Sequence, residues 1–414
     1  MTTTDETTPR AGAHDALEFD PFSDVFFNDP YPVYRRMRDE APVYYSEKYD
    51  FYALSRHADV TAAYKNVEVF SSSKGVDLST IRKGFQNKDL PVPKLIIMID
   101  PPDHNRLRVL VSRVFTPRAI GNLEPMVRSV IEGFLDNAPW PDVDVVQDWS
   151  GPFPVEIICQ MLGVPEENRQ QIRHWLDRSL HREPGEVGVS EDGIAAGIEA
   201  GMFYYGLVAH KRENPGDDMI TRLIQAEVTR EDGTTTSLDD VEITGFVSLL
   251  GGAGAETVTK LVGNAPVLFA DNPDQWQKIL DDPSKIPGAV EEILRYHPPA
   301  QYVCRYTLKP ITLHGVEIPA DKPVLLINGS ASRDERAYPD PDVFDIERDQ
   351  GQNIGFGYGV HSCLGAALAR MESRIAIELM RERMPNFELH RDRLRRVNMT
   401  NVAGFSSVPV TVLP

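Results

Sequence analysis

The sequence of 414 residues carries 43 basic and 62 acidic side chains, a formal net charge of −19. Such a chain is a poor partner for nucleic acids or anionic membranes, because phosphate groups attract positive charge. Its three cysteines, Cys159, Cys304 and Cys363, are too scattered for a disulfide framework. The polar N-terminus lacks a signal peptide and no apolar run is long enough to span a membrane, so we expect a cytoplasmic protein.

The N-terminal segment, residues 1–16, is rich in threonine and acidic residues, which is typical of a disordered leader. No internal repeat or Gly/Ser linker divides residues 17–414, so we expect them to form a single domain. A short helix is predicted at 30–38, and strands at 43–45 and 51–54. Residues 71–98 have no steady period, which predicts a long loop with a functional role.

Helical periodicity dominates the middle of the chain. The predicted helices cover residues 104–114, 117–138, 153–162, 166–179, 193–211, 217–227, 239–269, 287–296 and 364–384. Strands are expected at 311–313, 316–318, 324–328 and 408–412. The expected fold class is therefore mainly α with a small β region.

The centre of the longest predicted helix contains three glycines within four residues, Gly251, Gly252 and Gly254. Each costs about 1 kcal/mol relative to alanine inside a helix. Either close helix packing or a local opening beside a ligand could account for them. Glu256 and Thr257 follow directly, and an acid beside an alcohol can pass protons to a bound group. From this segment alone, both interpretations stay open.

A second pattern is an acid and a base three residues apart, Glu292 and Arg295. On a helix surface such a pair contributes a few tenths of a kcal/mol. The apolar neighbours Val290, Ile293 and Leu294 instead favour a buried structural ion pair.

Cys363 lies in the glycine-rich stretch 356–365. A nucleophilic cysteine needs a histidine base, and His361 is too close along the loop for good geometry, although other histidines could serve through space. A zinc site would need further Cys or His residues at ligand spacing. An axial thiolate to haem iron needs one cysteine and small neighbours, which this loop supplies.

The spacing Phe356-x-x-Gly359-x-x-x-Cys363-x-Gly365 resembles the haem-binding signature of the cytochrome P450 family. Glu292-x-x-Arg295 is similar to its Glu-x-x-Arg motif, and residues 253–257 to its oxygen-binding helix motif. The resemblance extends from about Phe22 to the end of the chain. It implies the cytochrome P450 fold, with a long central helix over a buried haem, and the soluble bacterial branch that accepts electrons from a ferredoxin.

The resemblance also implies roles for individual residues. Cys363 would be the axial thiolate, which in this enzyme class favours O–O cleavage. Gly359 and Gly365 would shape the loop, and Phe356 would cover the thiolate side of the haem. The residues expected to bind the haem propionates are His104, Arg108, Arg305 and His361. Thr257 with Glu256 would deliver protons to dioxygen, and Arg348 would be the third partner of Glu292 and Arg295.

The implied function is a haem-thiolate monooxygenase that inserts one oxygen atom of O2 into a C–H bond of a small hydrophobic substrate, such as a fatty-acyl, terpenoid, steroid or aromatic compound. The implied cofactor is haem b (iron protoporphyrin IX), with electrons from NAD(P)H through a ferredoxin reductase and a ferredoxin. A peroxide-driven peroxygenase and a non-catalytic haem protein are the alternatives, and the retained Glu256–Thr257 pair argues against both. We expect a monomer without nucleic-acid partner or membrane anchor.

Two surfaces follow from the same resemblance. The substrate pocket is expected to be apolar and to include Val76, Leu78, Phe85, Leu250, Ala253, Val303 and Phe405. A basic patch for an acidic ferredoxin is expected from Arg106, Arg113, Arg118, Arg370 and Arg374.

Overall fold

The computed structural model describes residues 16–83, 95–112, 115–229 and 233–414. Its axis is the 32-residue helix α12 (Asp240–Asp271). The helix begins with a capping box, in which the Asp239 side chain accepts from the Glu242 N–H and the Glu242 side chain accepts from the Asp239 N–H. Most of α12 beyond Ala255 is buried on all sides, so the helix forms the centre of the largest hydrophobic core.

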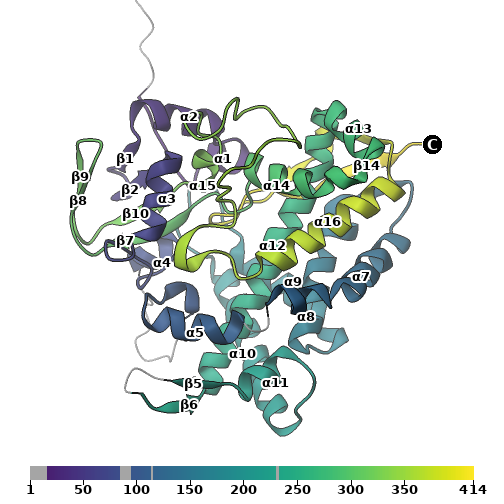
Figure 1. The fold of residues 1–414 in the computed structure, drawn as a ribbon, viewed down its shortest axis with the longest axis horizontal. Coiled ribbons are helices and arrows are strands. Elements are labelled where there is room, and N and C mark those ends of the chain that lie inside the picture. Colours follow the sequence, from purple (N-terminus) through teal and green to yellow (C-terminus); the bar gives the residue numbers. More distant parts are fainter. Residues whose placement is uncertain (1–15, 84–94, 113–114, 230–232) are drawn as a thin grey trace, which may run out of the picture.

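The remaining helices surround α12 on the right of Figure 1 and flank the strands on its left. They are α1 (Asp24–Asn28), α2 (Tyr31–Glu40), α3 (His57–Lys65), α4 (Leu78–Lys83), α5 (Asp103–Ser112), α6 (Pro117–Gly121), α7 (Glu124–Asp136), α8 (Pro152–Leu162), α9 (Glu166–Leu180), α10 (Glu191–Glu213), α11 (Met219–Ile224), α13 (Pro273–Asp281), α14 (Ile286–Tyr296), α15 (Asn328–Ala331) and α16 (Ala366–Arg383). Helices α8, α10 and α16 pack directly against α12.

The main sheet has five strands in the order β1-β2-β10-β7-β3. These are β1 (Val43–Ser46), β2 (Phe51–Leu54), β3 (Phe70–Ser71), β7 (Val303–Thr307) and β10 (Pro323–Leu326). Strand β10 runs parallel to β2 and antiparallel to β7. The sheet therefore joins the N-terminal segment to residues that follow the central helices, and smaller aromatic and aliphatic cores lie against it.

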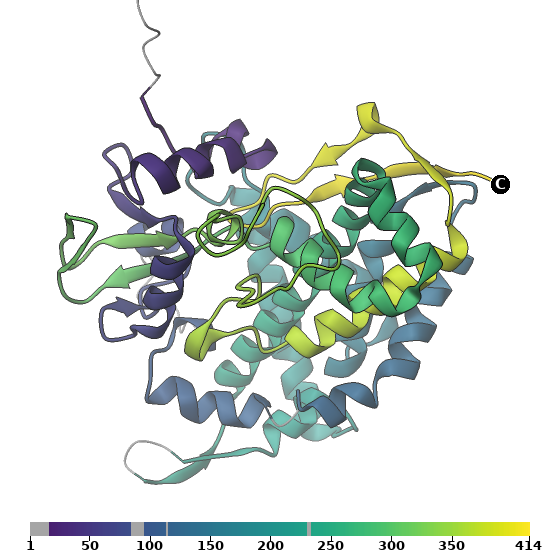
Figure 2. The same ribbon diagram turned by 45° about the horizontal axis from the view of Figure 1, so that its top comes forward.

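The other strands form small sheets. They are β4 (Asp142–Asp144), β5 (Glu227–Thr229), β6 (Thr235–Ser237), β8 (Ile311–Leu313), β9 (Val316–Ile318), β11 (Phe387–Leu389), β12 (Arg395–Arg396), β13 (Phe405–Ser407) and β14 (Pro409–Val412). Strands β11, β14 and β4 form one three-stranded sheet. Figure 2 shows the yellow C-terminal strands running beside the helical part.

The mainly α fold class with a small β region is confirmed, and several element boundaries differ from the prediction. The helix predicted at 117–138 is broken into α6 and α7, because the chain turns at Asn122 and Leu123 before Pro125 begins a new helix. The long loop predicted at 71–98 contains α4. Helix α13 was not predicted. The predicted leader lies outside the described residues, apart from Ala16, and the single domain stays a prediction.

No helix in the described part of the chain is long and apolar enough to cross a membrane.

Candidate active site

The loop before α16 is shaped by glycines in the left-handed region. Gly357 has φ 68° and Gly359 has φ 72°, a conformation that L side chains rarely adopt. A Cβ on Gly359 would also lie 2.6 Å from the carbonyl oxygen of Tyr64. The Cys363 N–H donates to the Phe356 carbonyl at 2.8 Å, which closes the loop. Cys363 is thereby held on the wall of an internal cavity.

That cavity has a volume of about 330 Å³ and lies between the Cys363 loop and one face of α12. Its walls are predominantly apolar. From α12 they include Phe246, Leu249, Leu250, Ala253, Gly254, Thr257, Val258 and Leu261, and from other elements Val76, Ile96, Ile97, Phe115, Ile158, Leu294, Val303, Phe356 and Leu368.

Four basic side chains gather at one end of the cavity, Arg108, Arg305, His361 and His104. The imidazole rings of His104 and His361 lie 4.3 Å apart, and the Nε2 atoms of both are buried without a hydrogen-bond partner. Burial, together with the charges of Arg305, His104 and Arg108, lowers the pKa of His361 to about 3. Such a cluster of donors suits an anionic ligand.

Opposing effects act on the pKa of the Cys363 thiol. Burial raises its pKa, whereas the Gly365 N–H and the positive charges of Arg108 and Arg370 lower it. Gly365 also lines the cavity, and a Cβ there would meet no protein atom within 4 Å. The sulfur therefore faces open space flanked by positive charge, which suits a thiolate that binds a metal.

Behind this loop lies a fully buried ion pair. Arg295 donates to Glu292 through Nη2 at 2.7 Å and through Nε at 2.8 Å, a bidentate geometry. Arg348 Nε lies 3.3 Å from Glu292 Oε1, so the predicted third partner is in place. Arg295 Nη1 also donates to the carbonyls of Ser332 and Pro341, tying α14 to the segment that leads toward the cysteine loop.

Comparison with known proteins decides the identity of this site. A sequence model of the family described as cytochrome P450 matches residues 286–411. Putative cytochrome P450 123 of Mycobacterium tuberculosis is 40% identical over 398 residues, which cover 96% of this chain and 97% of that protein. The chain belongs to the cytochrome P450 family.

Two further relatives illustrate the range of the family. Vitamin D(3) 25-hydroxylase of Pseudonocardia autotrophica is 35% identical, with 96% of this chain and 97% of that protein covered. The structure of a mutant of P450 EryK in complex with erythromycin B superposes with a TM-score of 0.83 at 36% identity, covering 92% of this chain and 95% of that one. The chain is a cytochrome P450 monooxygenase of bacterial type, whose family binds haem and uses dioxygen with electrons from redox partners.

The residues around the cavity fit a haem. The thiol of Cys363 faces the cavity, and the unpartnered Nε2 atoms of His104 and His361 lie with Arg108 and Arg305 where two carboxylates would be bound. Most of the residues predicted to contact the cofactor line this cavity, although they come from α5, β7 and the cysteine loop, and His104 lies against His361 at its edge. Gly359 does not line the cavity and lies close to the Tyr64 carbonyl instead. Phe356 lines the same cavity, and the Arg370 guanidinium lies 4.6 Å from its ring centroid.

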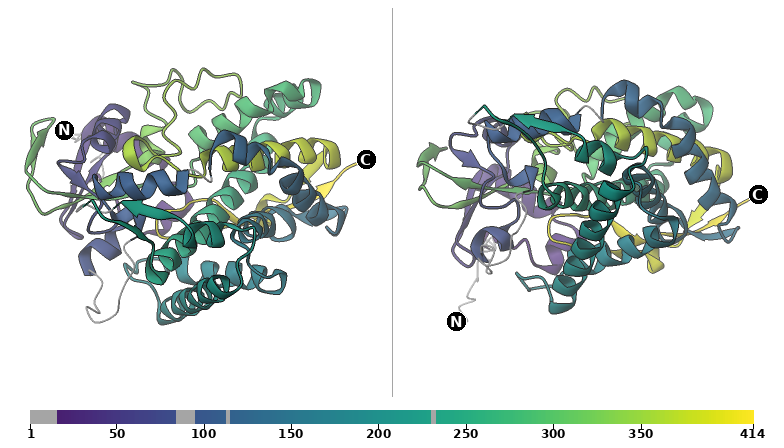
Figure 3. Two further views of the ribbon diagram at one scale, coloured as in Figure 1. Left: turned by 60° about the horizontal axis from the view of Figure 1, so that its bottom comes forward. Right: turned by 90° about the horizontal axis from the view of Figure 1, so that it is seen from below.

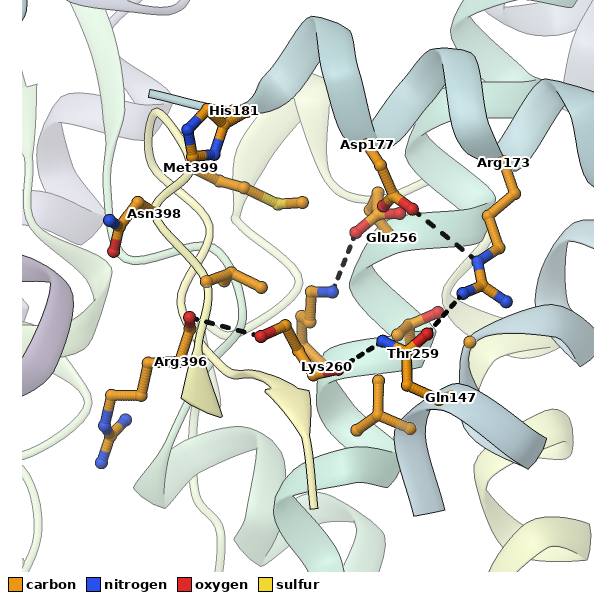
Figure 4. Close-up of a pocket in the computed structure, with 14 residues that line it drawn as sticks. Gln147, Arg173, Asp177, His181, Glu256, Thr259, Lys260, Arg396, Asn398 and Met399 are labelled. Atoms are coloured by element: carbon orange, nitrogen blue, oxygen red, sulfur yellow. Dashed lines mark hydrogen bonds and ion pairs between the residues drawn. The ribbon is translucent and has the colours of Figure 1, made fainter. Parts of the chain in front are cut away.

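The predicted proton-delivery pair has an unexpected arrangement. Thr257 lines the haem cavity and donates to the Ala253 carbonyl at 2.9 Å. Glu256 instead faces a second cavity of about 270 Å³ beside α12. There Lys260 Nζ lies 3.1 Å from a Glu256 carboxylate oxygen, with both side chains buried. Figure 4 shows Asp177 of α9 beside Glu256. Arg173, also on α9, forms an ion pair with Asp177.

Two carboxyl groups, Asp177 and Glu256, lie together in this second cavity. Burial and the nearby charge of Glu256 raise the pKa of Asp177 to about 6, against the lowering effects of Lys260 and Arg173. Arg396, which also lines the cavity, turns its guanidinium away from this cluster in Figure 4. The polar cavity thus places titratable groups beside the helix that also lines the haem cavity.

Several predicted pocket residues lie elsewhere. Val76, Leu250, Ala253 and Val303 line the cavity as expected. Leu78 does not, because it is fully buried in the aromatic core beside the main sheet. Phe405 does not either, because its ring packs into the helical core with the Arg396 guanidinium over it. Phe85 lies outside the described residues.

The sequence prediction missed many of the residues that line the cavity, among them Asn401, Phe246 and Glu372. Asn401 lines the cavity near where Phe405 was expected, and Phe246 lies two helical turns before Ala253 on the same face of α12. Helical spacing from Ala253 would have indicated Phe246. Glu372 on α16 also lines the cavity, and burial raises the pKa of its carboxyl well above the ordinary value.

The predicted basic patch is largely neutralised. Arg374 contacts Glu124 and Glu378, Arg370 contacts Glu291, and Arg106 contacts Asp103. Arg113 lies outside the described residues. Arg118 is exposed on α6, and no ion pair is recorded for it within the described ranges.

Proposed function

We propose that this chain hydroxylates a neutral, apolar substrate of the steroid or terpenoid class, with electrons passed from NAD(P)H through a ferredoxin reductase and a ferredoxin. The observation that carries the proposal is the apolar wall of the cavity opposite Cys363, formed by Ile158, Phe246 and Leu250 among others. Of the substrates considered from the sequence, fatty acids carry a carboxylate that needs a cationic anchor.

Among the residues that the structure describes, no such anchor lines the apolar part of the cavity. In the part of the chain that the structure describes, no lysine lines this cavity. The Lys74 Nζ lies 4.0 Å from Asp321 and 3.8 Å from the centroid of the Tyr306 ring. Arg108 and Arg305 belong to the cluster that would bind the haem propionates. The names of the vitamin D(3) hydroxylase and of the EryK–erythromycin B complex also favour a bulky substrate with few charges.

In the proposed mechanism Cys363 would bind the iron of haem b, which would supply the oxygen-activating chemistry. His104, Arg108, Arg305 and His361 would hold its carboxylates. The apolar walls exclude water and orient the substrate. The Thr257 hydroxyl is the proposed proton donor in the haem cavity. The Glu256 carboxyl takes up protons from the polar cavity. Transfer requires the Glu256 carboxyl to turn away from Lys260 or to act through water.

The cofactor assignment is tested by the carbon monoxide complex of the reduced protein. We expect the red-shifted Soret band of thiolate ligation, and Cys363→Ser should lose it. A normal band in Cys363→Ser would contradict the role of this cysteine. Turnover with NADH, a ferredoxin and its reductase should exceed turnover with peroxide; the reverse order would favour the peroxygenase.

The substrate class is tested by titrating the haem-loaded protein with matched panels of neutral steroids, terpenoids and fatty acids. We expect steroids or terpenoids to displace the water ligand, seen as a Soret shift. A shift produced only by fatty acids would overturn the neutral-substrate proposal. For the redox partner, Arg118→Glu should slow reduction by ferredoxin without changing substrate affinity. Unchanged reduction would remove Arg118 from the docking site. The cytoplasmic location stays a prediction.

A further inference from the structure

Helix α10 presents an apolar stripe to solvent. Ile194, Ile198, Met202 and Tyr205 are 54%, 57%, 71% and 50% exposed. Their spacing of four, four and three residues places them on one face of the helix. The opposite face, with Ala196, Tyr204 and Val208, is buried, and the helix packs there on α9 and α12. In Figure 3 the teal α10 lies at the periphery of the molecule. A contiguous exposed apolar stripe marks an interaction surface.

Small residues make the stripe suitable for close contact with another helix. Gly197, Gly201 and Gly206 flank the large side chains, and a Cβ built on any of them meets nothing within 4 Å. Each glycine costs helix stability, about 1 kcal/mol relative to alanine. Their open space instead lets a second backbone approach, so that a large side chain of one helix fits over a glycine of the other.

The charges at the ends of α10 make the stripe complementary to itself. Glu191 and Asp192 lie in the first turn, and Lys211 and Arg212 in the last. On a helical projection, Glu191 and Arg212 fall on the same face as the apolar stripe, one at each end. Arg212 contacts Asp240 and its side chain remains 35% exposed. An antiparallel copy of the same helix would meet opposite charge at both ends.

We propose that the chain forms a twofold-symmetric homodimer in which two copies of α10 pack antiparallel, and not the monomer expected from the sequence. An axis between Gly201 and Met202 places Met202 against Gly201 of the second copy. The same axis pairs Ile198 with Tyr205, Ile194 with Ala209, and Glu191 with Arg212. Every large apolar residue of the stripe then has an apolar or small partner, as an isologous interface requires.

A membrane is a poorer occupant of this surface. Helices that lie in the membrane interface carry Lys and Arg along their polar flanks. Here the flanks hold Glu199, and the chain has a net charge of −19. A single helix face is small beside the roughly 800 Å² per partner of standard interfaces. The dimer should therefore be weak and concentration-dependent.

Sedimentation velocity of the haem-loaded protein over a hundredfold concentration series tests the proposal. The wild type should pass from monomer to dimer, and Met202→Arg should weaken the dimer at least tenfold. Leu308→Arg changes a comparably exposed apolar residue outside α10 and should leave dimerisation unchanged. A wild type that stays monomeric throughout, or a Met202→Arg variant that dimerises like the wild type, would overturn the proposal.

Cross-linking tests the register. Met202→Cys, close to the axis, should form an intermolecular disulfide under mild oxidation. Ile194→Cys alone should not, whereas Ile194→Cys combined with Ala209→Cys should. Cys159 and Cys304 are buried, and the wild type gives the background from Cys363. Equal cross-linking of the two single variants would contradict the antiparallel register. A third test is co-flotation with phosphatidylglycerol vesicles. If the wild type floats with the vesicles, Met202→Arg does not, and no dimer forms in solution, the stripe binds membranes and the dimer proposal is overturned.

Discussion

Glu256 and Thr257 are neighbours in sequence, yet they line two different cavities beside α12. Successive residues of an α-helix are about 100° apart, so a carboxyl and a hydroxyl on adjacent positions can face two compartments. The acid lies in the polar cavity and the alcohol in the apolar one. In the proposed mechanism, proton supply and proton delivery therefore belong to different faces of one helix.

The first prediction concerns Thr257. Thr257→Ala should lower the product formed per electron consumed by roughly a hundredfold, the low end of the effect of a positioned proton donor, and should release peroxide. The measurement is NADH consumption against product and peroxide. Thr259→Ala is the matched control, because Thr259 makes the same type of bond to the carbonyl four residues earlier but lines the other cavity. Equal uncoupling in both variants would remove the special role of Thr257.

The second prediction concerns the buried pair of Lys260 and Glu256. Both side chains are about 5% exposed, so removing one partner leaves an uncompensated charge. Lys260→Met should lower the free energy of unfolding by about 3–5 kcal/mol. The double variant Lys260→Met, Glu256→Gln should recover most of the loss, because both charges are then absent. Denaturant unfolding of all four members of this cycle gives the coupling energy. Additive losses would show that the pair does not interact.

The parts of the site that could be predicted from the sequence are those whose residues lie close together along the chain. The cysteine loop and the Glu292–Arg295 pair are short motifs whose side chains meet within a turn or two, so their positions could be read directly. The orientation of Glu256 could also have been predicted. Glu256 and Lys260 are one helical turn apart and share one face of the helix, whereas Ala253 and Thr257, also one turn apart, share another. The sequence prediction treated the acid and the alcohol as one group and missed this division.

Contacts between distant segments could not be predicted in this way. Arg374 was expected to be free for a ferredoxin, but its partner Glu124 is 250 residues earlier in the chain. The choice between Asn401 and Phe405 as a cavity residue depends on how the C-terminal segment turns near Ala403, whose N–H donates to the Pro299 carbonyl. Both depend on tertiary packing, for which no local pattern exists.

The third prediction concerns the cysteine loop. Gly359→Ala should lower the free energy of unfolding by more than about 2 kcal/mol, because the positive φ of 72° costs about 1–2 kcal/mol and the new Cβ would press on the Tyr64 carbonyl. Gly315→Ala separates the two effects, since Gly315 has φ 79° but open space around it. That control should lose only about 1–2 kcal/mol. Denaturant unfolding measures both, and equal losses would exclude the steric contribution at Gly359.

The fourth prediction is an acid-labile contact at His297. Burial, together with the charges of Arg396 and Arg333, lowers the pKa of this imidazole from 6.5 to about 3. Arg396 Nη1 lies 3.3 Å from Nε2 and can only donate, so Nε2 accepts and Nδ1 carries the proton toward the Tyr31 oxygen, also 3.3 Å away. The neutral ring is therefore built into the contact between the N-terminal helices and the C-terminal segment.

A histidine whose folded-state pKa is depressed contributes stability above its unfolded pKa of 6.5, and this stability is lost as the pH falls toward about 3. Between pH 7 and pH 5 the wild type should lose about 2 kcal/mol through this group. His297→Gln cannot gain a proton, so its unfolding free energy should fall less over the same range. His174→Gln, on the exposed face of α9, should follow the wild type. If His297→Gln and the wild type showed parallel pH profiles, protonation of His297 would not be the cause of acid lability.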